Sequence, residues 1–345
     1  MMDQKAAELL LKGYNREKLS KDDCRYLLSF QEFSPEAIFS RDLFSRFFRE
    51  QCGNTAAIGA QIGVYTGPCS GNCGFCNFGA SHTHSKHYVM SDDVLKGYLD
   101  ECNRYGDVTT ISLMTNQDCP IETLLHFVEF TKANVPDSVE IMVNTGDKSA
   151  DEFRMLKDAG AVTAYHVCRM GEGKDTAFDP KDRIQTMRNI KEAGLNLMTC
   201  TEPVGAEHSV DEVIDNYFGG MKGGCDCGYM ALRMPVFGTP LGNLPTLSIK
   251  RYHQMQSVLG LASTWHDGGK RVTGWDTGYF TGLNTLSAEL AGSPRDSAPL
   301  SEKSAGHTLE WCRRTLFGDG FDKIRMADGS VKPLVVEHLK MTGSI

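Results

Sequence analysis

The sequence lacks the features that direct a protein to a membrane or to a polyanion. Its first residues, MMDQKAAELLLKGYNREKL, contain no apolar stretch followed by a small-residue cleavage site, and no window is apolar for long enough to span a bilayer. Positive charge is also scarce, since 36 Lys and Arg against 44 Asp and Glu leave a net charge of −8. An acidic surface gains nothing from counterion release, so we expect neither nucleic-acid nor membrane partners. We expect a cytoplasmic protein with a small-molecule substrate.

The sequence also lacks internal repeats and low-complexity tracts, and its 345 residues suffice for one large domain with extensions. Its 12 cysteines are numerous, but the chain is too long for a small disulfide scaffold, and no secretory signal is evident. In a reducing compartment we expect thiols or metal ligands instead of disulfides.

Strand-like and helix-like segments alternate along most of the chain. The expected strands are 62–66, 108–114, 139–143, 162–168, 195–203 and 229–236. Ser20, Ser91, Ser149 and Asp179 mark helix starts between or before them. This alternation predicts an α/β fold, a TIM-type (β/α) barrel that is closed or nearly closed.

The segments outside the barrel are less regular. The expected divisions are an N-terminal helical extension 1–57, the barrel 58–321 and a C-terminal tail 322–345. Glycines interrupt every pattern beyond residue 261, where we expect only a surface loop at 293–304 and a last helix at 307–317.

Three cysteines lie together directly after the first strand, in the segment CSGNCGFC. Thiolates as close as Cys69, Cys73 and Cys76 favour a shared cation. A tetrahedral zinc site would need a fourth ligand, for which the nearby candidates are His82, His84 and His87. A [4Fe-4S] cluster with three cysteines keeps one iron open for another ligand, and the second CxxC pair typical of zinc sites is missing. The pattern therefore favours iron–sulfur.

The same segment resembles the CxxxCxxC signature of the radical S-adenosylmethionine (SAM) enzymes. The resemblance implies that Cys69, Cys73 and Cys76 hold a [4Fe-4S] cluster and that Phe75 contacts the adenine of SAM. In that family the open iron binds SAM, and one electron cleaves it to methionine and a 5′-deoxyadenosyl radical. The family also implies an electron donor such as flavodoxin or ferredoxin.

Further SAM contacts are expected at the ends of later strands, where barrel enzymes carry their reacting groups. Asn116 and Gln117 follow the second strand, at the position from which the family hydrogen-bonds the SAM amino group, although they could equally cap the next helix. Arg169 could hold a carboxylate of SAM or substrate, and Glu172 the ribose hydroxyls, unless they form an exposed pair. Val204 matches the family's adenine-facing position.

Three more cysteines fall at or near the ends of different strands. A barrel could bring Cys119, Cys168 and Cys200 together as ligands of an auxiliary iron–sulfur cluster, or they could be unrelated core residues. Both interpretations remain open. Cys225 and Cys227 begin the sixth strand, at the opposite face, and are interpreted as structural.

Between residues 57 and 321 the chain resembles biotin synthase and its relatives, through Asn144-Thr-Gly146 and the turn Gly238-Thr-Pro-Leu241. The resemblance implies sulfur insertion into dethiobiotin or a similar molecule, with the auxiliary cluster as sulfur donor, and a homodimer. The third strand, however, carries no cysteine, and YHVCRMGEG replaces a family motif. A maturase or methylornithine synthase type of enzyme is the alternative. A non-catalytic zinc protein is the alternative of another class.

Overall fold

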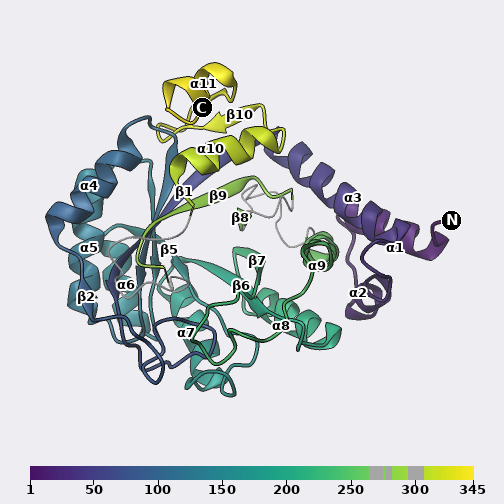
Figure 1. Ribbon diagram of the computed structural model, residues 1–345, viewed down its shortest axis with the longest axis horizontal. Coiled ribbons are helices and arrows are strands. Elements are labelled where there is room, and N and C mark those ends of the chain that lie inside the picture. Colours follow the sequence, from purple (N-terminus) through teal and green to yellow (C-terminus); the bar gives the residue numbers. More distant parts are fainter. Residues whose placement is uncertain (264–274, 277–281, 294–306) are drawn as a thin grey trace.

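The computed structural model describes residues 1–263, 275–276, 282–293 and 307–345, shown in Figure 1. The strands are β1 Thr55–Thr66, β2 Tyr88–Val89, β3 Val108–Thr115, β4 Glu140–Asn144, β5 Ala161–Tyr165, β6 Asn196–Val204, β7 Cys227–Leu232, β8 Trp275–Asp276, β9 Thr285–Ala291, β10 Lys323–Arg325 and β11 Val331–Pro333. The helices are α1 Gln4–Tyr14, α2 Lys21–Leu28, α3 Pro35–Cys52, α4 Asp92–Asn103, α5 Ile121–Asn134, α6 Ala150–Asp158, α7 Pro180–Glu192, α8 Val210–Lys222, α9 Ile249–Ser263, α10 Leu309–Gly318 and α11 Val336–Met341.

A curled parallel sheet forms the centre of the molecule. Its order is β9-β1-β3-β4-β5-β6-β7, with the long strand β1 paired to β3 on one side and to β9 on the other. Helices α4 to α8 connect the strands around the outside, so the carboxyl ends of the strands meet at one rim. The predicted α/β barrel is confirmed. Within the described ranges no pairing joins β7 to β8 or β9, which leaves the barrel open on that side.

Side chains of α9 cover the free edge of β7. The backbone N–H of Met230 donates to Gln256 Oε1 at 2.8 Å, and the Tyr252 hydroxyl donates to the Met230 carbonyl at 2.7 Å. These bonds satisfy strand groups that would otherwise be exposed at a sheet edge. Helix α9 is buried from Tyr252 to Ala262, because α1, α2 and α3 pack over it (Figure 1). The N-terminal helices thus belong to the wall of the open barrel.

Local signals explain where several helices begin. Ser20 and Ser149, both predicted helix starts, each form a capping box with the acidic residue three positions later. Asp179 accepts a hydrogen bond from Lys181 N at the start of α7, which confirms its predicted role. Ser91 is the N-cap of α4, but its side chain makes no capping hydrogen bond.

The C-terminal part contains more structure than the sequence predicts. Strand β9 lies in the glycine-rich region, and the predicted tail holds β10, β11 and α11. Strand β10 pairs in parallel with the start of β1, so the chain returns to the beginning of the barrel. The expected loop 293–304 lies, except for Ser293, outside the described residues. In the part of the chain that is described, no helix is long and apolar enough to cross a membrane.

Candidate active site

The loop after β1 holds three cysteines in a compact fold. Cys69 N donates to the Phe78 carbonyl at 2.7 Å, and Cys69 O accepts from Ala80 N at 3.1 Å. Gly71 lies against the ring of Phe178, whose Cζ would be only 2.2 Å from a Cβ at that position, so a side chain there would force the ring to move. Cys73 is buried, whereas Cys69 and Cys76 are half-buried.

Two later segments fix the position of this loop. Gly74 N donates to the carbonyl of Asp175, and Gly74 O accepts from Leu241 N, both at 2.8 Å. Ala177 N donates to the Gly71 carbonyl at 2.9 Å. The cysteine loop, the segment after β5 and the Gly-Thr-Pro-Leu turn after β7 therefore form one rim at the carboxyl ends of the strands.

Two adjoining cavities lie inside this rim. The rim cavity, of about 110 Å³, is lined by all three cysteines of the loop together with Asn116, Gln117, Asn144 and Arg169. The inner cavity, of about 230 Å³, extends into the barrel. The two share Cys73, Cys76, Met114, Asn144, Tyr165 and Arg169. A group held by the cysteines would thus face the interior of the barrel.

The three thiols of the cysteine loop line one cavity. Among the described residues, no three His, Cys, Asp or Glu side chains come close enough to hold one metal ion. Zinc would need its donors within about 2.0 to 2.3 Å of one point, whereas these thiols surround a cavity. His82 is engaged elsewhere, since its Nε2 lies 2.8 Å from the Cys76 carbonyl. Burial raises the pKa of Cys73 to about 11 and of Cys76 to about 12, so metal binding must displace their protons.

Asn116 and Gln117 both line the rim cavity, but each also holds the backbone. Asn116 Nδ2 lies 3.4 and 3.3 Å from the carbonyls of Gly67 and Pro68, and its Oδ1 accepts from Asp118 N at 3.0 Å. Gln117 Oε1 accepts from Asp147 N at 3.1 Å. Asn116 therefore fastens the cysteine loop to the end of β3.

Arg169 is the cation that faces both cavities. Its guanidinium lies 5.9 Å from the centre of the Phe75 ring, and its Nε lies 3.5 Å from Glu202 Oε1 without forming a hydrogen bond. Burial lowers the pKa of Arg169, but Glu202 and other negative groups more than compensate, so the pKa stays above its ordinary value. A buried guanidinium with an unused donor is prepared to bind an anion.

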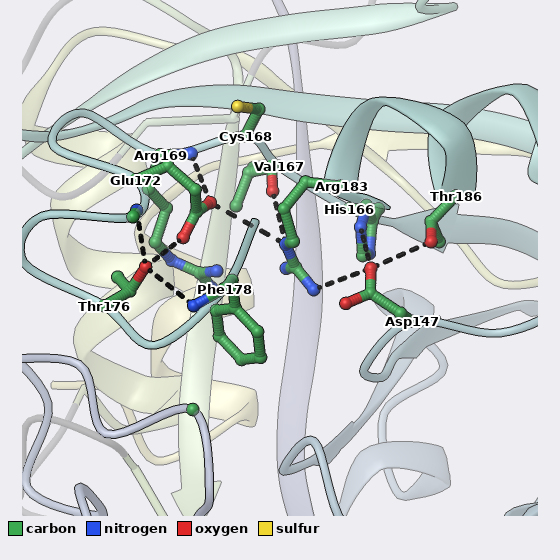
Figure 2. A network of polar contacts seen from close by, with 12 residues as sticks. Asp147, His166, Val167, Cys168, Arg169, Glu172, Thr176, Phe178, Arg183 and Thr186 are labelled. Carbon is green, nitrogen blue, oxygen red and sulfur yellow. Dashed lines mark hydrogen bonds and ion pairs between the residues drawn. The ribbon is translucent and has the colours of Figure 1, made fainter. Parts of the chain in front are cut away.

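Behind Arg169 lies a network of buried charges, shown in Figure 2. Glu172 accepts hydrogen bonds from Arg169 N at 2.7 Å and from Thr176 Oγ1 at 2.6 Å, and it lies 3.7 Å from Arg183 Nε. Arg183 also donates to Asp147 at 3.1 Å and stacks over Phe178. Both carboxylate oxygens of Glu172 are occupied within the loop, and the residue lines neither cavity. Its geometry does not support the expected contact with ribose hydroxyls.

No protein-family model matches the chain. Biotin synthase of Aquifex aeolicus is 24% identical over 268 residues, which covers 72% of this chain and 76% of the relative. Biotin synthase of Hydrogenobaculum sp. is 25% identical over 257 residues, covering 70% and 75%. Methylornithine synthase (PylB) superposes with a TM-score of 0.75 at 17% identity, covering 93% of this chain and 98% of that one. The hydrogenase maturase HydG superposes with a TM-score of 0.76 at 13% identity, covering 93% and 76%.

These sequence relatives and the shared barrel agree with the cysteine signature. The chain resembles the biotin synthases in sequence, and its fold is that of methylornithine synthase and HydG.

The remaining predicted residues do not all reach the cavities. Val204, the last residue of β6, is fully buried in the apolar core that joins α8 and α9 to the N-terminal helices, and it lines neither cavity. Its neighbour Pro203 lines the inner cavity instead.

Cys119 lies apart from the other two cysteines, whereas Cys168 and Cys200 both line one outer cavity. Cys119 packs in the core between the sheet and its outer helices, because the chain turns into α5 directly after it. Strand β5 ends at Tyr165, so Cys168 lies beyond the strand and lines an outer cavity of about 540 Å³. Cys200 lies within β6 and packs against side chains in the barrel interior. A position near a strand end does not determine which way a side chain points.

The sequence did not predict three buried or half-buried charged residues of the site, because they lie on segments with no motif of their own. Arg183 lies on α7, a helix rich in charged residues, yet it is 3% exposed. His166 is fully enclosed 3.2 Å from Asp147, and burial lowers its pKa to about 4. Asp147 directly follows Asn144-Thr-Gly146, a segment on which the resemblance to biotin synthase rests. This position could have indicated that Asp147 belongs to the site.

Proposed function

We propose that Cys69, Cys73 and Cys76 hold the [4Fe-4S] cluster of this enzyme and that SAM extends from the rim cavity beside it into the adjoining inner cavity. When bound, such a cluster supplies the electron that cleaves SAM into methionine and a 5′-deoxyadenosyl radical. The observation that carries the proposal is that one cavity contains three thiols and the unsaturated guanidinium of Arg169. The inner cavity then holds a small substrate next to the radical.

The protein side chains have separate roles in this proposal. Arg169 holds the SAM carboxylate, because it lines both cavities and its Nε makes no hydrogen bond to Glu202, whose Oε1 lies 3.5 Å away. Phe75 offers an aromatic face at the inner cavity for the adenine. Asn116 hydrogen-bonds the backbone just before the cysteine loop and so holds this loop at the end of β3.

Metal analysis and product analysis of the anaerobic protein test the proposal together. We expect about four iron and four sulfide per chain, as one cubane cluster requires. With SAM and a strong reductant, 5′-deoxyadenosine should appear. Stoichiometric zinc in place of iron, or an iron-loaded protein that forms no 5′-deoxyadenosine, would contradict it.

Biotin synthase-type sulfur insertion is the second candidate, because the sequence relatives reported above are biotin synthases. It needs an auxiliary cluster, and of the three cysteines expected to hold it only Cys168 and Cys200 line a common cavity, whereas Cys119 packs elsewhere in the core. Dethiobiotin with anaerobic enzyme and SAM is the direct assay. Biotin formation with about four additional irons would establish this candidate. Radical formation without biotin would favour a different small substrate.

A further inference from the structure

Two tyrosines and a cysteine form a distinct group inside the barrel. Tyr165 is on β5, Cys200 on β6 and Tyr229 on β7, so three adjacent strands contribute one residue each. Cys200 and Tyr229 are direct partners in the parallel pairing of β6 and β7. The two rings lie 6.3 Å apart between centroids. All three belong to the cluster of side chains that fills the barrel interior.

The hydrogens of these three groups stay in place at neutral pH. Burial raises the pKa of Tyr165, Tyr229 and Cys200 well above their ordinary values, and the negative charge of Glu202 adds to the effect. The two tyrosine hydroxyls lower the pKa of the Cys200 thiol, but less than burial raises it. The strand pairing places Cys200 beside Tyr229 on the same face of the sheet. The group thus offers hydrogen atoms and not negative charge.

This group separates two cavities. Tyr165 and Tyr229 line the inner cavity, which Cys73 and Cys76 also line, so the radical would form within the same space. On the other side, Cys200 and Tyr229 line the outer cavity of about 540 Å³ between the sheet, α8 and α9. Tyr229 therefore lines both cavities, and Cys200 lines the outer cavity beside it.

We propose, on the basis of the proposed radical function, that Tyr229 and Cys200 form a hydrogen-atom relay. A carbon radical in the inner cavity takes the hydrogen atom of the Tyr229 hydroxyl, which forms a C–H bond and breaks the O–H bond. The resulting phenoxyl radical takes the hydrogen atom of the Cys200 thiol. The sulfur radical returns to the thiol with one electron from the low-potential donor that SAM cleavage already requires and one proton from water in the outer cavity. Tyr165 is a positioning residue that packs Tyr229 against Cys200.

The relay determines what kind of product leaves the enzyme. A substrate radical that receives a hydrogen atom ends with a new C–H bond, as in a rearrangement or a fragmentation. Sulfur insertion would end in a carbon–sulfur bond and would not use the relay. The Tyr229–Cys200 pair is thus a feature that distinguishes the two candidate reactions.

Deuterium transfer tests the relay without knowledge of the substrate. The full-length, cluster-loaded enzyme is equilibrated in D₂O and given SAM and dithionite alone, and the deuterium content of 5′-deoxyadenosine is measured by mass spectrometry. Hydroxyl and thiol hydrogens exchange with D₂O, whereas carbon-bound hydrogens do not. We expect one deuterium per product molecule in the wild type and loss of that deuterium in Tyr229→Phe.

Matched variants separate the relay from a structural effect. Tyr217→Phe removes the hydroxyl of a buried tyrosine that lines only the outer cavity, and it should keep the deuterium. Cys200→Ala should still transfer one deuterium, but its tyrosyl radical should persist and be detectable by EPR. The double variant Cys200→Ala/Tyr229→Phe should show no such radical. Undeuterated product from the wild type, or equal deuterium in Tyr229→Phe, would overturn the relay. Absence of any 5′-deoxyadenosine would instead overturn the proposed function on which the relay rests.

Discussion

The two ends of the barrel each contain a buried arginine network, and the two differ in how completely their donors are used. At the amino ends of the strands, Arg313 of α10 donates to both oxygens of Asp107 at 2.7 and 2.9 Å, and His338 Nε2 lies 3.2 Å from the same carboxylate. At the carboxyl ends, Arg169 Nε has no hydrogen-bond partner within reach of good geometry. Arg313 is almost fully buried and its donors are used, whereas Arg169 is partly exposed at the cavities and its Nε has no hydrogen bond. We interpret the first as holding the fold together and the second as open to a ligand.

The Asp107 network joins distant parts of the chain. Asp107 precedes β3, whereas Arg313 and His338 lie on α10 and α11, so one carboxylate fixes the C-terminal helices to the barrel. The Arg169 network is local by comparison, because most of its members lie on the segment between β5 and α7. We expect mutations of the first network to reduce stability and mutations of the second to reduce ligand binding.

The largest expected effect is the loss of SAM cleavage when a cysteine at the carboxyl end of the barrel is replaced, whereas replacing one at the amino end should have no such effect. Cys73→Ala should abolish 5′-deoxyadenosine formation, because two thiols cannot hold the cluster in the geometry that leaves one iron open. Cys312→Ala is the matched control, since Cys312 is a buried thiol of α10 next to Arg313 and far in the fold from the rim. SAM cleavage by purified Cys73→Ala, measured by chromatography, would remove the cysteine loop from the mechanism.

Arg313→Met should be the most destabilising single change in the Asp107 network. It leaves the carboxylate of Asp107 buried without its partner, which typically costs about 3 to 5 kcal/mol. Chemical unfolding of wild type and variant measures the difference. The variant should retain SAM cleavage per folded molecule, and a loss below about 1 kcal/mol would mean that Arg313 is not the main partner of Asp107.

Arg169→Met should weaken SAM binding more than it lowers stability, the reverse of Arg313→Met. Removing a charged hydrogen bond to SAM typically costs about 1.5 to 3 kcal/mol, which corresponds to a KM for SAM raised roughly 10- to 100-fold. The free energy of unfolding should change less than in Arg313→Met, because Arg169 makes no saturated ion pair. An unchanged KM would show that Arg169 does not hold the SAM carboxylate.

The comparison also explains what the sequence could predict. The strand–helix alternation and the cysteine loop follow from local patterns, and the capping boxes at Ser20 and Ser149 follow from neighbouring side chains. Strand β9 could not be found, because its stability comes from pairing with β1 across a glycine-rich stretch that carries no periodic signal of its own. The sequence distance between Asp107 and Arg313 conceals their pairing in the same way.

Side-chain direction limited the prediction of the site itself. Cys119, Cys168 and Glu172 lie near the rim in sequence, but the ends of β3 and β5 turn their side chains toward a helix, an outer cavity or the loop's own backbone. Arg169 was predicted from its place at the end of the expected fourth strand, and it lines both cavities. The sequence can thus predict which polar residues lie near the rim of the barrel. It cannot predict which neighbour each one contacts, because a strand that ends one or two residues earlier turns the side chain in another direction.

The smallest expected effect is the pH dependence of the Asp107 network. Burial alone would raise the pKa of Asp107, but hydrogen bonds from Arg313 and His338 lower it from 3.8 to about 2. A carboxyl whose pKa is lower in the folded state stabilises the fold above its unfolded pKa and loses that contribution as the pH falls from about 4 to about 2. The loss should be about 2 kcal/mol. Unfolding free energies measured across this range should fall more steeply for the wild type than for Asp107→Asn/Arg313→Met, in which neither charge remains, and parallel curves would show that this carboxylate is not the one that titrates.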